Sequence, residues 1–230
     1  MIANKKEFTL GAALMAGFIV VLVLIFMPLF SGHNGLDYLD SLYNSISKGS
    51  AYYIPKMKEG IKAVKGQAIN VTLTLPDEAM TEKAALLLNK SGALLNVSGT
   101  RVKVSGDLEA ILANCLEDAD ALYKNDDESI KSKYGVTGAR EMVYCWWLSL
   151  KEMDKDLKKQ ELFKEAKVIY QVETKAVETA YNYYGIKAEN IKDKIGIVLF
   201  SLIFYVIYTL WYGYAILYMA EGWGLELESH

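Results

Sequence analysis

Residues 195–220 read IGIVLFSLIFYVIYTLWYGYAILYMA, a run of 26 residues without a charged side chain. An α-helix rises about 1.5 Å per residue, so this run is long enough to cross a hydrocarbon core of roughly 30 Å with some tilt. A second apolar run, residues 8–30, lies near the other end of the chain. Residues 31–194, between the two runs, are polar and patterned. We therefore predict two transmembrane helices that flank one water-facing domain.

The composition narrows the class of function. The chain has 230 residues and a net charge of −3, and it lacks the broad basic surface that nucleic-acid binding requires. Its two cysteines and two histidines are too few and too widely spaced for a zinc finger. The sequence contains no GxGxxG, Walker A, HExxH or GxSxG motif. We nominate no catalytic residue, no metal ligand and no cofactor, and the sequence favours a non-enzymatic protein.

The charges near the first apolar run predict its orientation. Lys5 and Lys6 precede a run that is too long for the core of a typical signal peptide, so we expect an uncleaved signal anchor, with a cleaved signal as the alternative. The positive-inside rule then places residues 1–7 and the tail 221–230 in the cytoplasm, and residues 31–194 outside it. Three lysines just before the second run weigh mildly against this orientation. The expected location is a cell membrane, the inner membrane if the source is bacterial.

The first part of the domain predicts a small α+β layer. Apolar residues alternate over 69–75, as in a half-buried strand, and helix signals begin at Asp77 and at Asp107. Between these helices, residues 93–106 predict a hairpin whose two-residue turn is Ser98–Gly99. That turn would place Leu95 opposite Val102 and Val97 opposite Thr100. The expected order is strand, helix, strand, strand, helix, with three strands in one sheet.

A long helical pattern follows over residues 138–184. Its apolar positions recur at intervals of four and three, as in a heptad seam, at Ala139, Val143, Trp146, Leu150, Met153 and Leu157. The phase slips near Lys158–Glu161 and then resumes, so either one helix with a phase break or two helices with a tight connection would fit. We expect this segment to run down to the second transmembrane helix and link it mechanically to the domain.

Cys115 and Cys145 lie in the domain that we expect to be exported, where a disulfide is allowed. A bridge that closes a loop of roughly 30 residues would stabilise the fold by about 3–4 kcal/mol on the chain-entropy model. The alternative is two buried thiols that pack as small apolar side chains. Cys115 lies on an apolar helix face and Cys145 adjoins two tryptophans, so the sequence leaves both possibilities open.

Small and aromatic residues in the two apolar runs indicate helix packing. Ala13 and Gly17, four residues apart, would let another helix approach closely, although ordinary alanine and glycine content would give the same pattern. The second run carries aromatic side chains along about 20 Å of helix axis: Tyr205, Tyr208, Trp211, Tyr212, Tyr214 and Tyr218. Because an unpaired hydroxyl deep in a bilayer is costly, we expect these side chains to meet other helices or lipid, and less readily a quinone-like ligand.

Four lysines lie between the first helix of the domain and its first strand. They are Lys56, Lys58, Lys62 and Lys65, with only Glu59 among them. Such a group could contact anionic lipid headgroups or a phosphate-bearing ligand. A solvated helix face is the simpler interpretation, and we prefer it.

These features together predict a non-enzymatic membrane protein that acts as an assembly or accessory subunit. Its partners would be the lipid bilayer and either further copies of itself or other membrane subunits. One alternative is a channel or transporter subunit built from several copies, although the two runs offer few polar residues to line a pore. A second alternative is a ligand sensor. The two-span layout resembles that of bacterial chemoreceptor-type sensors, but the ten residues after the second run would require a separate signalling partner.

Overall fold

The structure is a computed structural model that describes residues 2–30 and 32–225. The described chain is mostly helical and contains a three-stranded antiparallel sheet. It forms two compact units. One is built from both ends of the chain, up to Gly49 and from Ala188 onward, and the other is Ser50–Lys187. Part of the predicted tail, residues 226–230, lies outside the described residues.

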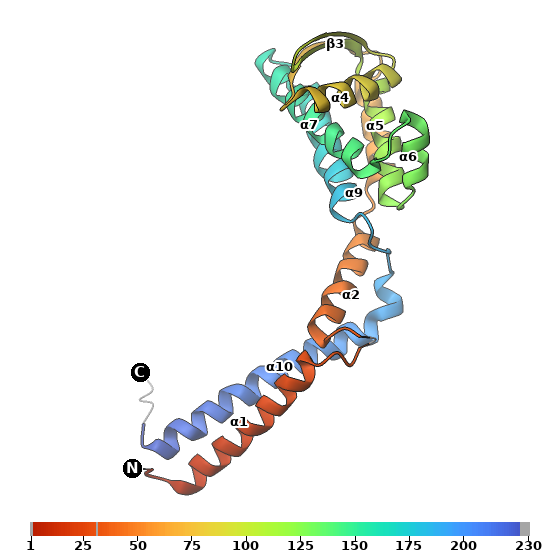
Figure 1. Cartoon of the computed structure of the whole chain (residues 1–230). Helices are drawn as coiled ribbons and strands as arrows, with labels where there is room; N and C mark the ends of the chain where they lie inside the picture. The colour runs from red at the N-terminus through yellow and green to blue at the C-terminus, as the bar shows by residue number, and fades with distance from the viewer. Residues whose placement is uncertain (1, 31, 226–230) are drawn as a thin grey trace. The chain divides into compact units, whose positions relative to one another are not determined.

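Two long helices dominate the first unit: α1 (Lys5–Phe26) and α10 (Ile191–Trp223). Both are long and apolar enough to cross a membrane. They lie side by side and antiparallel (Figure 1). Helix α1 ends earlier than the apolar run predicted because Pro28 disfavours the helical conformation in the residue before it, and Met27 is extended with ψ 146°.

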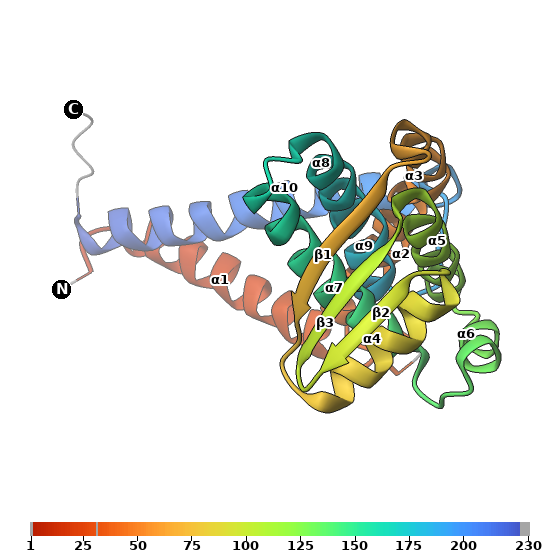
Figure 2. The ribbon, with the colours of Figure 1, turned by 90° about the horizontal axis from the view of Figure 1, so that it is seen from above.

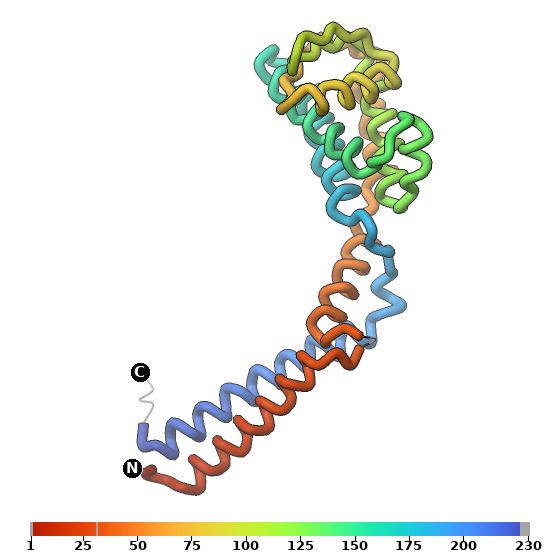
Figure 3. Tube along the Cα trace, in the orientation of Figure 1, coloured from red at the N-terminus to blue at the C-terminus, as the bar shows by residue number. Residues whose placement is uncertain are grey.

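Close backbone approach brings the two apolar helices together at their ends. A Cβ atom added to Gly11 would lie 2.6 Å from the backbone nitrogen of Met219, and one added to Gly222 would collide with the backbone of Phe8. The backbone nitrogen of Asn4 donates to the carbonyl oxygen of Gly222 at 3.0 Å. The start of α1 and the end of α10 therefore lie at the same end of this hairpin (Figure 3).

A third helix, α2 (Gly35–Ser50), completes the first unit. Asn34 caps it, because its side chain accepts a hydrogen bond from the backbone nitrogen of Asp37 at 2.9 Å. The Tyr43 hydroxyl lies 2.6 Å from the Ser201 hydroxyl, which fixes α2 against the first part of α10.

The sheet of the second unit has the strand order β1-β3-β2, all antiparallel, as Figure 2 shows. Its strands are β1 (Ala68–Thr74), β2 (Leu94–Ser98) and β3 (Arg101–Asp107). Two of the helices that pack against it are α4 (Glu78–Lys90) and α5 (Leu108–Tyr123). The predicted order of strand, helix, hairpin and helix is confirmed, and Asp77 and Asp107 cap the two helices as expected.

The register of the hairpin differs from the prediction by two residues. The turn is Gly99–Thr100, so Val97 pairs with Val102, and Leu95 pairs with Val104. Gly99 has φ +56°, a conformation that glycine adopts at the first central position of a two-residue hairpin turn. A shift of two residues keeps every side chain on its original face, which is why the apolar pattern was also compatible with the wrong register.

The predicted helical segment 138–184 is interrupted near Glu161 and contains a π-helical turn further along. Helix α7 (Ala139–Lys159) ends before Glu161, which has φ +61°, and α8 (Phe163–Val172) begins beyond it. A π-helical turn, η2 (Glu173–Val177), then leads into α9 (Glu178–Asn182). Of the two possibilities that the sequence allowed, the tight connection between two helices is correct.

The expectation that this segment continues as a helix into the second apolar run is wrong. The helix stops at Asn182, and residues 183–190 are not helical. Gly185 has φ +80°, and its backbone nitrogen donates to the Asn125 side chain at 2.8 Å. A left-handed φ cannot continue a right-handed helix. Glycine adopts this conformation easily, whereas other residues adopt it only at a cost.

The inward face of α7 forms the centre of the core of the second unit. All six seam residues, from Ala139 to Leu157, are buried, and Trp146 is fully buried. Helix α7 contacts β1, α4, α5 and α8. The remaining helices of this unit are α3 (Ile54–Gly60), η1 (Ile61–Val64) and α6 (Asp127–Tyr134).

Candidate functional site

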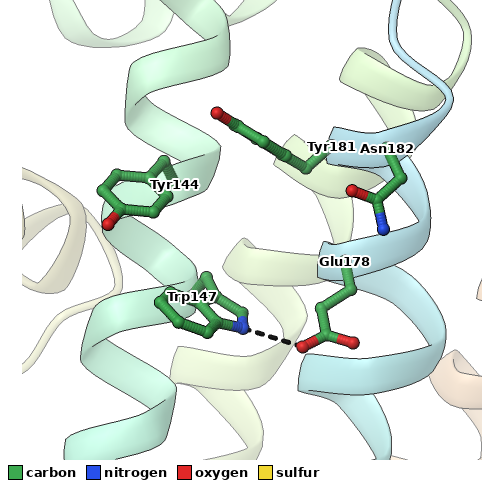
Figure 4. Close-up of a pocket in the computed structure, with 5 residues that line it drawn as sticks. All are labelled: Tyr144, Trp147, Glu178, Tyr181 and Asn182. Atoms are coloured by element: carbon green, nitrogen blue, oxygen red, sulfur yellow. Dashed lines mark hydrogen bonds between the residues drawn. The ribbon is translucent and has the colours of Figure 1, made fainter.

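A hollow of about 320 Å³ lies on the surface of the second unit between α7 and α9. It is lined by Tyr144, Trp147, Glu178, Tyr181 and Asn182, as Figure 4 shows. Its volume is at the lower end of the range for small-molecule sites. Three aromatic rings and one carboxylate therefore meet at a place that a small ligand could enter.

The three rings form a continuous row. The Tyr144 and Trp147 rings are stacked with centroids 5.7 Å apart and planes 19° apart. The Tyr181 ring, from α9, lies 5.9 Å from Tyr144 at 41°. Because Tyr144 belongs to both pairs, it is the central ring of the row.

Helix periodicity explains why these side chains are available. The seam at Val143, Trp146 and Leu150 points into the core, so Tyr144 and Trp147 fall outside it. In α9, Glu178 and Tyr181 are three residues apart and therefore share a face. The Trp147 ring nitrogen donates to the Glu178 carboxylate at 2.9 Å, which joins the two helices across the floor of the hollow.

Two basic side chains lie at the ends of the aromatic row. The Arg140 guanidinium carbon is 4.3 Å from the centroid of Tyr181, and the Lys151 ammonium nitrogen is 4.6 Å from that of Trp147. Both distances are within the range of cation–π attraction. No such cation lies over Tyr144 among the described residues. The two outer rings therefore contact basic side chains of the protein itself, whereas the central ring does not.

A buried carboxyl group interacts electrostatically with Glu178, one of the residues that line the hollow. Glu173, in the π-helical turn, is 7% exposed, and burial raises its pKa to about 7, with further upward contributions from Glu178 and Asp154. Lys151 and Lys158 act in the opposite direction. One side-chain oxygen of Asp154 is buried without a hydrogen-bond partner. The negative potential in this region is therefore only partly compensated.

These acidic side chains do not form a metal site. Among the residues that the structure describes, no three His, Cys, Asp or Glu side chains are grouped so that they could hold a metal ion. The arrangement of aromatic faces with one carboxylate suits recognition of an organic cation better than it suits coordination.

A second polar cluster, around Asp118, is structural. Asp118 is 2% exposed, and its carboxylate accepts hydrogen bonds from the Trp146 ring nitrogen at 2.7 Å and from the Tyr134 hydroxyl at 2.5 Å. Lys133 pairs with it at 2.7 Å. Burial, reinforced by the neighbouring Asp118, raises the pKa of Tyr134. Because every partner is satisfied within the fold, this cluster holds α5, α6 and α7 together.

The aromatic residues of α10 that sequence reasoning singled out fall into two groups. Tyr208 and Trp211 face α1, where they donate to the carbonyl oxygens of Phe18 at 3.2 Å and Leu14 at 2.9 Å. The Trp211 ring also lies 2.9 Å from the position that a Cβ atom on Gly17 would occupy. These contacts are internal to the hairpin.

The other tyrosines leave more of their rings exposed, and among them Tyr212 still packs against Phe18 of α1, with ring centroids 5.0 Å apart. Tyr205 is 68% exposed, Tyr214 is 54% exposed and Tyr212 is 44% exposed. Within the described residues, the hydroxyls of these three side chains have no hydrogen-bond partner, and the same holds for Tyr218. Ala13 is exposed on α1, so of the predicted small pair only Gly17 lies against the neighbouring helix.

The four lysines are partly neutralised. Lys58 pairs with Asp120 at 3.3 Å, and Lys62 pairs with Glu59 at 2.6 Å. Lys56 and Lys65 make no ion pair among the described residues. Half of the group is thus engaged with neighbouring carboxylates, in keeping with a solvated face.

The disulfide that the sequence allowed is not formed. Cys115 and Cys145 are both free and buried, and the Cys145 sulfur lies 3.4 Å from the carbonyl oxygen of Met80. Burial raises the pKa of Cys145 to about 12 and that of Cys115 well above its usual value. Each thiol packs as a small apolar side chain, the alternative considered from the sequence.

Sequence reasoning missed the aromatic hollow. The signal available in the sequence was the spacing of Arg140, Tyr144, Trp147 and Lys151, which recur at intervals of four, three and four beside the core seam. This second stripe marks one outward face of α7. The position of α9 opposite this stripe could not be predicted because it depends on the break near Glu161.

No family model, curated protein or solved structure matches the chain. Two structural features indicate function: the exposed tyrosine hydroxyls of α10 and the aromatic hollow between α7 and α9.

Proposed function

We propose that this protein is a membrane-anchored accessory subunit that assembles with further membrane helices, either of a second copy or of another subunit. In this proposal, α1 and α10 cross the bilayer as a hairpin. The unit Ser50–Lys187 is the water-facing domain. The partner helix contacts the outward face of α10.

The observation that carries the proposal is the position of Tyr205. It lies near the middle of the 26-residue uncharged run, and its hydroxyl has no partner among the described residues. Transferring a hydroxyl from water into hydrocarbon without a hydrogen bond costs about 4–8 kcal/mol. Tyr208, one turn away, illustrates the alternative, since its hydroxyl donates to a backbone carbonyl of α1. A partner helix would supply Tyr205 with an acceptor of the same kind.

We further propose that the two ends of the chain, residues 1–7 and 221–230, are cytoplasmic and that residues 31–194 are extracytoplasmic. Lys5 and Lys6 support this orientation through the positive-inside rule. The hydrogen bond between Asn4 and Gly222 supports placing the two ends on the same side of the bilayer.

Photo-crosslinking in native membranes tests the assembly. A benzophenone amino acid at position 205 should give a crosslinked species of higher mass than the monomer. The same group at position 208 should react within the chain, because this position faces α1. At position 206, which is exposed on a different face of α10, it should meet mainly lipid. A crosslink at 205 no stronger than that at 206 would argue against a partner on this face.

A further inference from the structure

The aromatic hollow has no part in the proposed assembly, which rests on α10. We propose that this hollow, formed by Tyr144, Trp147, Tyr181 and Glu178, binds an organic cation of the quaternary-ammonium class.

Aromatic rings attract cations electrostatically. An aromatic face is electronegative and attracts a cation within about 6 Å of its centroid, and cages of such rings recognise alkylated ammonium groups. Here the rings converge from two helices, with Tyr144 between the other two. This convergence offers a cation several faces or edges at once, whereas a single exposed ring would offer one.

The chain itself shows that these rings attract cations. Arg140 and Lys151 lie over the two outer rings at 4.3 and 4.6 Å. Between them, the described chain places no basic group over Tyr144. The central ring is therefore the one that remains open to a ligand cation.

The carboxylate of Glu178 adds a negative charge to the hollow. It lines the hollow and is held by the Trp147 ring nitrogen at 2.9 Å, so it is positioned before any ligand arrives. Glu173 interacts electrostatically with Glu178, so its ionised form would add to the negative potential. A bulky, weakly hydrated cation gains from both the rings and the carboxylates, whereas a neutral molecule of the same shape gains only from apolar contact.

The Asn182 amide and the volume of about 320 Å³ further limit the size and chemistry of the ligand. The space accommodates a trimethylammonium group with a short polar substituent. The amide can hydrogen-bond that substituent, because it offers both a donor and an acceptor.

Binding should also release protons. A cation in the hollow favours the ionised form of Glu173, whose pKa is raised to about 7 in the unliganded protein, chiefly by burial. Asp154 and Glu178 raise this pKa further, while Lys151 and Lys158 lower it. Near pH 7, part of the Glu173 population is therefore protonated and can lose its proton when the cation enters.

The test is isothermal titration of the full chain, in a maltoside detergent that lacks choline headgroups, with tetramethylammonium and with choline. The control ligand is 3,3-dimethylbutan-1-ol, the neutral isostere of choline. We expect saturable binding of the cations, with proton release in buffers of different ionisation enthalpy, and binding of the isostere that is at least about 5-fold weaker.

Matched variants locate the site. Tyr144→Leu and Glu178→Gln should each weaken choline binding by about 5- to 30-fold, whereas Tyr144→Phe, which keeps the aromatic face, should retain it. Tyr170→Leu on α8 and Glu82→Gln on α4 are exposed controls that should change nothing. Tyr144 is itself 37% exposed, so its replacement should leave the fold intact.

Three results would each overturn the proposal. The first is the absence of saturable binding of either cation to the wild-type chain. The second is equal binding of the neutral isostere, and the third is equal loss of binding in the control variants. None of these results would bear on the assembly through α10, because that proposal depends on crosslinking at position 205.

Discussion

At the scale of single residues, Glu173 is the clearest case of a side chain held in an unfavourable environment. Its carboxyl group is 7% exposed and lies near Glu178 and Asp154, with Lys151 and Lys158 as partial compensation. Burial raises its pKa from 4.5 to about 7. It occupies a π-helical turn, an irregularity that is often found at functional sites.

This raised pKa predicts a pH dependence of stability. The folded state binds the Glu173 proton more tightly than the unfolded state does. The contribution of this proton to the free energy of unfolding is therefore fully present below about pH 4.5 and is lost as the pH rises through about 7. At about 1.4 kcal/mol per pKa unit, the loss between pH 5 and pH 8 is roughly 2–3 kcal/mol. Glu173→Gln should remove this loss, as measured by thermal unfolding at the two pH values.

The exposed Glu82→Gln variant is the control for that measurement, because its carboxyl group lies in water. It should keep the wild-type pH dependence. A Glu173→Gln variant that loses as much stability between pH 5 and pH 8 as the wild type would contradict the assignment of the raised pKa to Glu173.

At the scale of elements, the α1–α10 hairpin depends on glycines at its points of closest approach. A Cβ atom on Gly11 would lie 2.6 Å from the Met219 nitrogen and 2.9 Å from the Ala215 carbonyl oxygen. On the same pair of helices, Gly213 has no atom within 4 Å of the corresponding position. The two glycines therefore serve different purposes, although both lie inside helices.

Gly11→Ala and Gly213→Ala should have opposite effects. Alanine favours a helix over glycine by about 1 kcal/mol, so Gly213→Ala should stabilise α10 slightly. Gly11→Ala should instead push the helices apart, with a net destabilisation of about 1–2 kcal/mol from overpacking. Hydrogen exchange of the α1 and α10 amides in detergent measures both effects. Equal exchange in the two variants would show that the close contact at Gly11 does not hold the hairpin together.

Local signals predicted most elements of the second unit but not their connections. The side chains of Asp77 and Asp107 marked two helix starts, and the seam along α7 marked its buried face. The hairpin register was wrong because shifts by an even number of residues preserve the apolar pattern. Helix α6 was missed because its sequence is polar, with Ile130 as its buried residue.

Of the two candidate sites, the sequence revealed the aromatic residues of α10 but not the hollow. The aromatic residues of α10 were visible in the sequence because an apolar run makes any polar atom conspicuous. Which of them face α1 depends on the rotation of the helix, and this is set by contacts such as the one between Gly17 and Trp211. The hollow requires Trp147 and Glu178 to meet across two helices, so no local pattern could reveal it.

At the scale of the whole molecule, the two compact units carry separate roles in this account. The hairpin contributes anchoring and the outward hydroxyls of α10, and the second unit contributes a core and the aromatic hollow. The break in helix between Asn182 and Asn190 removes the continuous helical link that the sequence predicted between them. Assembly and cation binding can therefore be tested independently of each other.

The native mass of the full chain, released from membranes in a mild detergent, tests assembly most directly. The monomer has a mass of 25.7 kDa. We expect a larger defined complex for the wild type, either a homo-oligomer or a complex with another subunit. Tyr205→Phe should shift the mass toward 25.7 kDa, whereas Tyr214→Phe, which lies nearer the end of α10, should not. A wild-type chain that runs as a clean monomer without any partner would rule out assembly through α10.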